Sequence, residues 1–320
     1  MPAPDLSVQA STAIGVAATV LWTNPDAPRE IDAPILAADP DPRAWAAGLD
    51  TPARRDLNDR ILTQLLAGEP VEVLEEHRDW LRVVAPWQPS DRDERGYPGW
   101  VPRAHVSVAA APAEREAVVT VEETRLEPAP GARGLVSAAL SYATILPVLD
   151  DAEGRVRVAT PGGGSAFLDA SACVVRQTGH AHPVDTRAVL AAARSFVGLS
   201  YLWGGMSAFG LDCSGLVHIS FRALGRIVPR DAHDQADASV RVPLADARPG
   251  DLLFFARPGK SIHHVGFAAG TPQGTPPAEG PYLLHAPGTG KEVCEEAMNA
   301  DRRATLVDLA GRLADSGDAP

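Results

Sequence analysis

Residues Gly210-Leu211-Asp212-Cys213-Ser214-Gly215-Leu216-Val217 form a glycine-flanked turn that leads directly into an apolar stretch of helical period. The pattern predicts that Cys213 lies in the first turn of a helix. Backbone N–H groups there have no intrahelical partner, and their partial positive charge favours the thiolate over the thiol. The sequence therefore predicts a nucleophilic cysteine. The alternative is an inert thiol, because free cysteine is among the most buried residue types.

Two later apolar runs carry histidine and are typical of β-strands, His263-His264-Val265-Gly266-Phe267 and Leu283-Leu284-His285-Ala286. Successive side chains of a strand point to opposite faces, so only one of His263 and His264 can face the cysteine. A single cysteine with distant histidines is typical of a Cys–His peptidase.

In this part of the chain, predicted helices come before predicted strands. Asp185 followed by the helix formers of residues 186–196 predicts a helix with Asp185 as its N-cap. A second helix is expected from about Cys213 to Leu224, with Gly225 as its C-terminal stop. The strand-like run 251–255 and the two histidine strands follow, which indicates an α+β fold and not a doubly wound parallel sheet.

The preceding residues contain a weak internal repeat of strand-like segments. Segments 68–74 and 80–83 are echoed by segments 143–149 and 155–158, and each copy then reaches a glycine-containing turn and another apolar strand. Two small all-β barrels in tandem explain this pattern. The Pro/Asp/Ala-rich residues 24–50 read as an insertion in the first barrel.

Composition shifts divide the chain into three predicted domains. We expect the first barrel domain over residues 1–110, the second over 111–178 and the α+β domain over 183–320. The joints are the Pro/Ala-rich segment 109–113 and the His/Pro segment 178–183. A chain of 320 residues is long enough for two or three domains.

Charge, the lengths of apolar runs and cysteine content argue against several classes of protein. The net charge of −12 argues against nucleic acid as a partner, because phosphates would be repelled, whereas a small substrate is readily accommodated. The sequence contains no apolar run of about 18 residues, so a membrane span is not expected. Cys173, Cys213 and Cys294 form neither a paired disulfide set nor a metal-ligand pattern, so we expect a reducing compartment and no metal or other cofactor.

The apolar segment 13–22 resembles the core of a signal peptide, but residues 1–12 contain Asp5 and no Lys or Arg. We therefore interpret it as a first β-strand and expect a cytoplasmic protein. A secreted or periplasmic protein that has lost a leader is the alternative.

Five motifs in order resemble those of the NlpC-type cysteine peptidases that act on bacterial cell-wall peptides. They are Tyr201-Leu202-Trp203-Gly204-Gly205, Asp212-Cys213-Ser214-Gly215-Leu216, Pro249-Gly250-Asp251-Leu252, His264-Val265-Gly266 and His285-Ala286-Pro287. The tandem SH3-like barrels, and the stretch 22–32 within the first, resemble the branch that acts as γ-D-glutamyl-L-diamino-acid dipeptidyl-peptidases. The resemblance implies a multidomain fold, in which two SH3-like all-β barrels precede an α+β papain-like cysteine peptidase domain.

The resemblance also implies roles for individual residues. Cys213 would be the nucleophile, His264 its base, and His285 the residue that orients His264. Without the resemblance, the sequence would favour equally an orienting role for His285 and a hydrogen-bonded histidine of the core. The backbone N–H of Cys213, with the hydroxyl of Tyr201, would stabilise the oxyanion, although Tyr201 also reads as a core aromatic.

A dipeptidyl-peptidase must also bind a free amino terminus. The resemblance assigns this task to Asp231, and the residues expected to complete the substrate pocket are Glu69, Tyr97 and Ser214. From local sequence alone, Glu69 reads as a solvated residue of a turn, and Tyr97 as part of a turn.

The sequence departs from the family pattern in two places. The Pro/Gly-rich segment 270–281 makes the connection between the histidine strands longer than expected, and Ala232 stands where a serine is expected, which puts one substrate hydrogen bond in doubt.

The leading hypothesis is a recycling peptidase that cuts γ-D-Glu from diaminopimelate or Lys in small murein peptides with a free N-terminal L-Ala. The alternatives are a secreted hydrolase of intact cell wall, a non-catalytic SH3-like peptide-binding protein, and an acyl transferase on the same fold.

Overall fold

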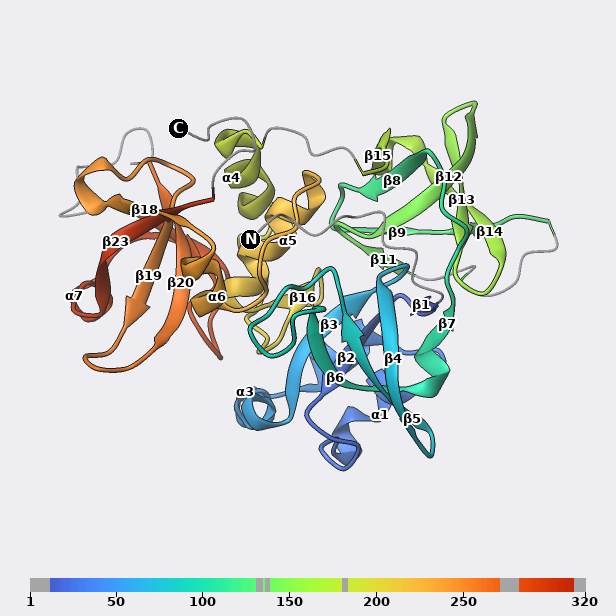
Figure 1. Ribbon diagram of the computed structural model, residues 1–320, viewed down its shortest axis with the longest axis horizontal. Coiled ribbons are helices and arrows are strands. Elements are labelled where there is room, and N and C mark those ends of the chain that lie inside the picture. The colour runs from blue at the N-terminus through green and yellow to red at the C-terminus, as the bar shows by residue number, and fades with distance from the viewer. Residues whose placement is uncertain (1–11, 131–134, 136–138, 180–183, 271–281, 314–320) are drawn as a thin grey trace.

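The computed structural model describes residues 12–130, 135, 139–179, 184–270 and 282–313. Within these ranges the chain forms three large antiparallel sheets, two short two-stranded sheets and a set of helices. Figure 1 shows the first barrel and the second barrel on one side and the α+β domain on the other, with α5 between them. Within the described residues, no helix has both the length and the apolar character needed to cross a membrane.

The first barrel is a seven-stranded sheet with the order β3-β2-β6-β5-β4-β1-β7. Its strands are β1 (Thr12–Ile14), β2 (Ala18–Trp22), β3 (Ile61–Leu66), β4 (Pro70–His77), β5 (Trp80–Ala85), β6 (Tyr97–Pro102) and β7 (Val106–Val108). The short helix η3 (Arg103–His105) lies between β6 and β7. The predicted insertion forms short helices between β2 and β3, namely η1 (Glu30–Asp32), α1 (Ala33–Leu36), α2 (Pro42–Gly48), α3 (Thr51–Arg55) and η2 (Asp56–Asp59).

The segment predicted as one strand over residues 13–22 forms two strands, because the chain turns after β1. The backbone of Gly15 passes so close to Ser107 that a Cβ on residue 15 would lie 2.2 Å from the Ser107 Oγ. The amide of Gly15 donates to the carbonyl of His105 at 2.8 Å. A glycine at this position lets β1 pair with β7 before the chain turns into β2.

The second barrel contains a six-stranded sheet with the order β10-β14-β13-β12-β8-β15 and the two-stranded pair β9 and β11. Its elements are β8 (Arg115–Val119), β9 (Glu123–Arg125), β10 (Glu127–Pro128), β11 (Ala139–Ser141), β12 (Ile145–Ala152), β13 (Arg155–Thr160), β14 (Gly164–Asp169), η4 (Ala170–Ala172) and β15 (Cys173–Gln177). The antiparallel succession β12-β13-β14 matches β4-β5-β6 of the first barrel, which confirms the predicted repeat.

The α+β domain places helices before a six-stranded antiparallel sheet with the order β18-β23-β19-β20-β21-β22. Its helices are α4 (Thr186–Arg194), α5 (Cys213–Ala223), α6 (Ala232–Asp237), η5 (Leu244–Asp246) and α7 (Ala300–Arg303). Its strands are β16 (Met206–Ser207), β17 (Gly210–Leu211), β18 (Val240–Pro243), β19 (Leu252–Ala256), β20 (Ile262–Ala269), β21 (Tyr282–His285), β22 (Cys294–Ala297) and β23 (Leu306–Arg312).

The two predicted helices of this domain are confirmed, together with the predicted N-cap Asp185 and the predicted stop Gly225. The Asp185 carboxylate accepts from the amide of Arg187 at 2.9 Å at the start of α4. The Asp212 carboxylate accepts from the amide of Gly215 at 2.6 Å at the start of α5. Gly225 adopts φ +88 just after the end of α5, where its amide bonds the carbonyl of Arg222.

One apolar core runs through all three parts of the chain. It includes Trp87 of the first barrel, Tyr142 of the second, and Phe196 and Leu216 of the α+β domain. The rings of Tyr142 and Phe196 meet edge to face at 5.1 Å. The barrels are therefore packed onto the domain that carries Cys213.

Candidate active site

Cys213 is the first residue of α5, and its side chain is almost buried, with 8% of its surface exposed. Helix α5 packs against β20, the strand that carries His264, and the backbone amides of Val265 and Ser214 act to lower the pKa of the Cys213 thiol. The fold therefore brings the predicted nucleophile to the strand that carries the predicted base.

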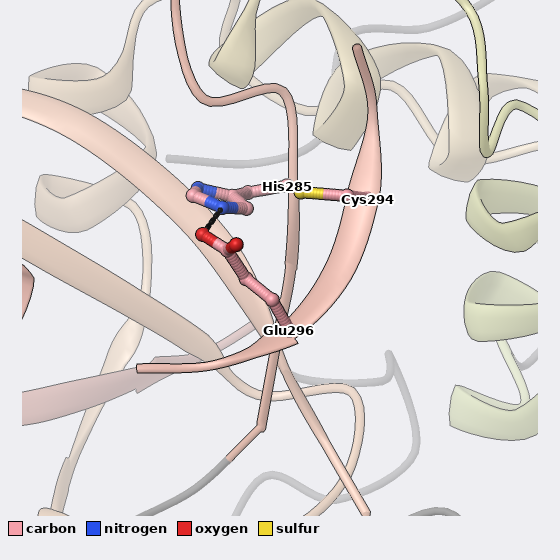
Figure 2. Close-up of side chains that lie close together, drawn as sticks. All are labelled: His285, Cys294 and Glu296. Atoms are coloured by element: carbon pink, nitrogen blue, oxygen red, sulfur yellow. Dashed lines mark hydrogen bonds and ion pairs between the residues drawn. The ribbon is translucent and has the colours of Figure 1, made fainter. Parts of the chain in front are cut away.

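The two predicted histidines lie on neighbouring strands and bond each other. His264 Nε2 lies 2.8 Å from His285 Nδ1, and His285 Nε2 lies 3.2 Å from a carboxylate oxygen of Glu296 on β22. Figure 2 shows His285 and Glu296 pointing toward each other. If His285 Nε2 donates to Glu296, then His285 Nδ1 accepts from His264 Nε2–H, and the Nδ1 lone pair of His264 is free to accept a proton.

The structure separates the two adjacent histidines as the strand alternation predicts. His264 is 4% exposed, whereas His263 is on the surface of β20. His263 lines a polar pocket with Arg257 and Arg302.

Burial shifts the pKa values of Cys213, His264 and His285 in the direction that favours the neutral form of each side chain. Burial, and next to it the carboxylate of Asp212, raises the pKa of the Cys213 thiol to about 12, against the lowering effect of the Val265 amide. Burial, then the charge of Arg302, holds the pKa of His264 well below its usual range and lowers that of His285 to about 4. The expected thiolate is therefore wrong for the ligand-free protein, because desolvation outweighs the stabilisation from the helix terminus.

Arg230 holds the residues on both sides of Cys213, and the sequence analysis missed it. Its guanidinium donates to Asp212 Oδ2 at 2.7 Å and to Ser214 Oγ at 2.9 Å, and its Nε donates to Thr63 of the first barrel at 2.8 Å. Arg230 is 1% exposed; although burial acts to lower its pKa, the contact with Asp212 raises it. The only sequence signal was its position next to Asp231.

Ser214 lies beside the nucleophile, but its polar atoms already have partners. Its hydroxyl donates to Asp212 at 3.3 Å and accepts from Arg230, and its carbonyl accepts from Gln235. The structure thus places Ser214 at the site and shows it bonded within the protein.

Tyr201 belongs to the same buried cluster as Cys213 and forms a β-bridge with Leu211, two residues before the cysteine. Burial raises the pKa of Tyr201 well above its usual value, and the nearby Cys213 and Asp212 add to the shift. The backbone of this residue is fixed by bonds from its amide to Lys291 and from Arg54 to its carbonyl. This position suits the expected contact with an oxyanion.

The predicted amine-binding aspartate is paired with the predicted tyrosine of the first barrel. The hydroxyl of Tyr97 donates to Asp231 Oδ2 at 2.8 Å, and Arg92 Nε lies 3.7 Å from the same oxygen. The side chain of Asp231 is 20% exposed. In the described part of the chain, the other oxygen of Asp231 accepts no hydrogen bond, so it is available to a ligand cation.

Glu69 is not part of this group, contrary to the prediction. It is fully buried, and its carboxylate receives Arg222 of α5 at 2.6 Å, the side chain of Gln88 at 2.8 Å and the amide of Leu66 at 3.1 Å. Its oxygens are therefore occupied inside the junction between the first barrel and the α+β domain.

Among the residues that the structure describes, two groups of three side chains have ligand atoms close enough to hold a metal ion. The first is His285, Cys294 and Glu296, which point toward one another from β21 and β22 in Figure 2, and the second is Asp91, His233 and Asp234. The first group includes the histidine that orients His264, so a bound ion would compete with that hydrogen bond pattern. Residues 180–183 of the predicted joint 178–183 and residues 271–281 of the predicted connection 270–281 lie outside the described residues.

Comparisons with known proteins cover almost the whole chain. The NlpC/P60 family model matches residues 198–306, the YKFC SH3b2 domain matches residues 119–175, and the bacterial SH3 domain matches residues 53–107. A γ-D-glutamyl-L-lysine dipeptidyl-peptidase from Bacillus subtilis (strain 168) is 37% identical over 283 residues, which is 85% of this chain and 88% of the relative.

Two further relatives agree with this result. A γ-D-glutamyl-L-lysine dipeptidyl-peptidase from Bacillus cereus is 32% identical over 265 residues, which is 80% of each chain. The crystal structure of an NlpC/P60 family protein from Bacillus cereus superimposes with a TM-score of 0.85 at 28% identity, over 94% of this chain and 99% of that one.

Proposed function

The chain belongs to the NlpC/P60 family of cysteine peptidases, and from this membership we propose that it hydrolyses the γ-D-Glu–L-diamino acid bond of small murein peptides with a free N-terminal L-Ala. The Tyr97–Asp231 pair carries the finer part of the proposal, because it offers a carboxylate oxygen to an ammonium close to the residues that hold Cys213. The proposed setting is the recycling of free wall peptides inside the cell.

The chemistry begins from a neutral thiol and a neutral imidazole. His264 takes the proton of Cys213 as the sulfur attacks the γ-carbonyl carbon of D-Glu. The protonated His264 then gives this proton to the departing amine, and a thioester remains on Cys213. Water, activated by the same imidazole, hydrolyses the thioester and restores the thiol.

His285 and Glu296 support this proton transfer by orienting His264. The chain of bonds from His264 to His285 to Glu296 keeps one nitrogen of His264 available for the cysteine proton and spreads the positive charge that develops. The amide of Cys213 is unbonded in the first turn of α5 among the described residues, so it can donate to the oxyanion together with the Tyr201 hydroxyl.

Asp231 binds the N-terminus of the peptide and so determines which bond is cut. A free L-Ala ammonium bonded to its open oxygen would place the second residue, D-Glu, over Cys213. A charge-assisted hydrogen bond of this kind contributes about 1.5–3 kcal/mol, so blocking the amine should weaken kcat/KM by about tenfold to a hundredfold. The residue after Asp231 is Ala232 in place of the expected serine, so the hydrogen bond expected from that serine hydroxyl is absent.

The test compares L-Ala-γ-D-Glu-diaminopimelate with its N-acetylated form. The native protein should release L-Ala-γ-D-Glu from the free peptide much faster, and Cys213→Ala should release none. Asp231→Asn should remove most of the preference for the free amine. Equal cutting of both peptides by the native protein would contradict the proposed role of Asp231.

A further inference from the structure

A polar pocket of about 290 Å³ is lined by His263, the neighbour of His264 in β20, and has no role in the mechanism above. Arg257 reaches it from the connection between β19 and β20, His263 from β20, and Lys291 from the connection between β21 and β22. Asn299, Arg302 and Thr305 reach it from α7 and its flanks. In Figure 1, α7 is at the far edge of the sheet from the first barrel.

The pocket is positively charged in a protein whose net charge is −12. Arg257, Lys291 and Arg302 face a single acidic side chain, Asp301. Partial burial, followed by the charges of Arg257 and Arg302, lowers the pKa of His263 and keeps it neutral. Three cations against one carboxylate leave a charge of about +2, the sign that attracts an anionic group.

Arg302 is the cation in this pocket that most needs an anionic partner. Its side chain is half-buried, and its guanidinium lies 5.3 Å from the centre of the Phe255 ring and 3.4 Å from the carbonyl of Pro287. Among the described residues, no carboxylate lies within ion-pair distance of it. A partly desolvated cation without an anion is unfavourable, and a ligand carboxylate would remove that cost.

The same guanidinium connects the pocket to the reacting atoms. Arg302 lies over the ring of Phe255, whose centre is 5.4 Å from that of the His264 ring, and it bonds the carbonyl of Pro287, two residues after His285. Whereas α7 lies away from the first barrel in Figure 1, Asp231 at the start of α6 is bonded to Tyr97 of that barrel. The site therefore offers an anion to one end of a bound peptide and a group of cations to the other.

We propose that this pocket binds a free carboxylate of the diamino-acid residue that leaves Cys213. The inference rests on the proposed function and deepens it. A small murein peptide has an ammonium at its N-terminus and a carboxylate beyond the scissile bond, which is the charge order that the site presents. The pocket thus makes the enzyme select peptides in which that carboxylate is free over peptides in which it is amidated.

Binding tests the pocket without requiring cleavage. Full-length protein carrying Cys213→Ala is titrated by calorimetry with L-Ala-γ-D-Glu-L-Lys and with the same peptide amidated at the Lys carboxyl group. The free acid should bind about 10- to 100-fold more tightly, as expected for a charge-assisted hydrogen bond. Adding Arg302→Gln should abolish most of this preference.

Two further substitutions guard against effects on folding. Lys291→Gln removes an exposed cation of the pocket and should reduce the preference by a smaller factor. Lys260→Gln removes an exposed cation from the β19–β20 connection, which also carries Arg257. Lys260 does not line the pocket, so this change should leave the preference unchanged.

Equal affinity for the acid and the amide would overturn the proposal, and so would a preference that survives both Arg302→Gln and Lys291→Gln. Cleavage of the two peptides by the native protein reports separately on the proposed function. A protein that cuts both peptides equally well and binds them equally well retains its function and loses the carboxylate pocket. A protein that cuts neither peptide but binds the acid preferentially loses the function and retains the pocket.

Discussion

At Cys213, two effects on the thiol oppose each other. The amides of Val265 and Ser214 and the helix start favour the thiolate, whereas burial and the neighbouring Asp212 favour the thiol. The pKa of about 12 means that the thiol prevails in the ligand-free protein. In the proposed mechanism, proton transfer to His264 therefore accompanies the attack on substrate and does not precede it.

Alkylation by iodoacetamide reports this protonation state. Because the pKa of Cys213 is raised above the ordinary thiol value of 9.0, its thiolate fraction at neutral pH is smaller than that of a free thiol. We expect the rate of alkylation to rise continuously between pH 5 and pH 9, measured by mass spectrometry. The Cys213→Ala protein serves as the control, because it reports the background from Cys173 and Cys294. A fast rate that does not change between pH 5 and pH 8 would reveal a preformed thiolate–imidazolium pair instead.

At the scale of the element, the start of α5 depends on one carboxylate with two tasks. Asp212 caps the helix through the amide of Gly215 and also neutralises Arg230, which is almost completely buried. Asp212→Ala removes the cap and leaves a buried charge without its partner. We expect a loss of about 3–5 kcal/mol in the free energy of unfolding, measured by urea denaturation.

Asp185 provides a matched control for that prediction. It caps α4 in the same way through the amide of Arg187, but it lies at the surface and pairs with no buried cation. Asp185→Ala should cost only about 1 kcal/mol. If both alanine variants lose the same free energy, the Asp212–Arg230 pair contributes nothing beyond capping.

The elements that could be predicted from sequence are those whose signals are local. Asp185 and Asp212 precede runs of helical period, and the repeat of strand patterns indicated two barrels before any comparison. The turn at Gly15 was not predictable, because its cause is contact with Ser107, which is distant in sequence. Within the site, the pairing of Asp231 with Tyr97 agrees with the expectation from family resemblance, although each residue alone has an ordinary explanation.

Arg230 and Glu69 show why the rest of the site could not be predicted. Arg230 bonds Thr63 and Asp212, which lie in two different domains, and no local pattern marks such a residue. Glu69 precedes a strand in a way typical of a solvated turn, yet it meets Arg222 on a helix 153 residues away. Both depend on how the first barrel docks onto the α+β domain.

At the scale of the whole molecule, the junction around Glu69 couples the first barrel to the helix that carries the nucleophile. Both Glu69 and Arg222 are completely buried, and Arg222 also lies over the ring of Trp87 at 4.9 Å. With one apolar core shared among the three parts, we expect the described domains to unfold in a single transition and not one by one.

Glu69→Gln tests this coupling because it removes the charge and changes the shape very little. Arg222 would be left as a buried charge without its partner, which should lower the free energy of unfolding by about 3–5 kcal/mol and reduce peptidase activity wherever unfolding becomes appreciable.

Glu72→Gln is the matched control: Glu72 pairs with Arg95 at 3.0 Å, but both side chains are about half exposed, so the loss should stay below about 1 kcal/mol. Calorimetric unfolding of the two variants measures the loss of free energy that each substitution causes. An equal effect of the two substitutions, or an early separate transition of the first barrel in Glu69→Gln with the rest of the protein unchanged, would show that the junction does not hold the nucleophile helix in place.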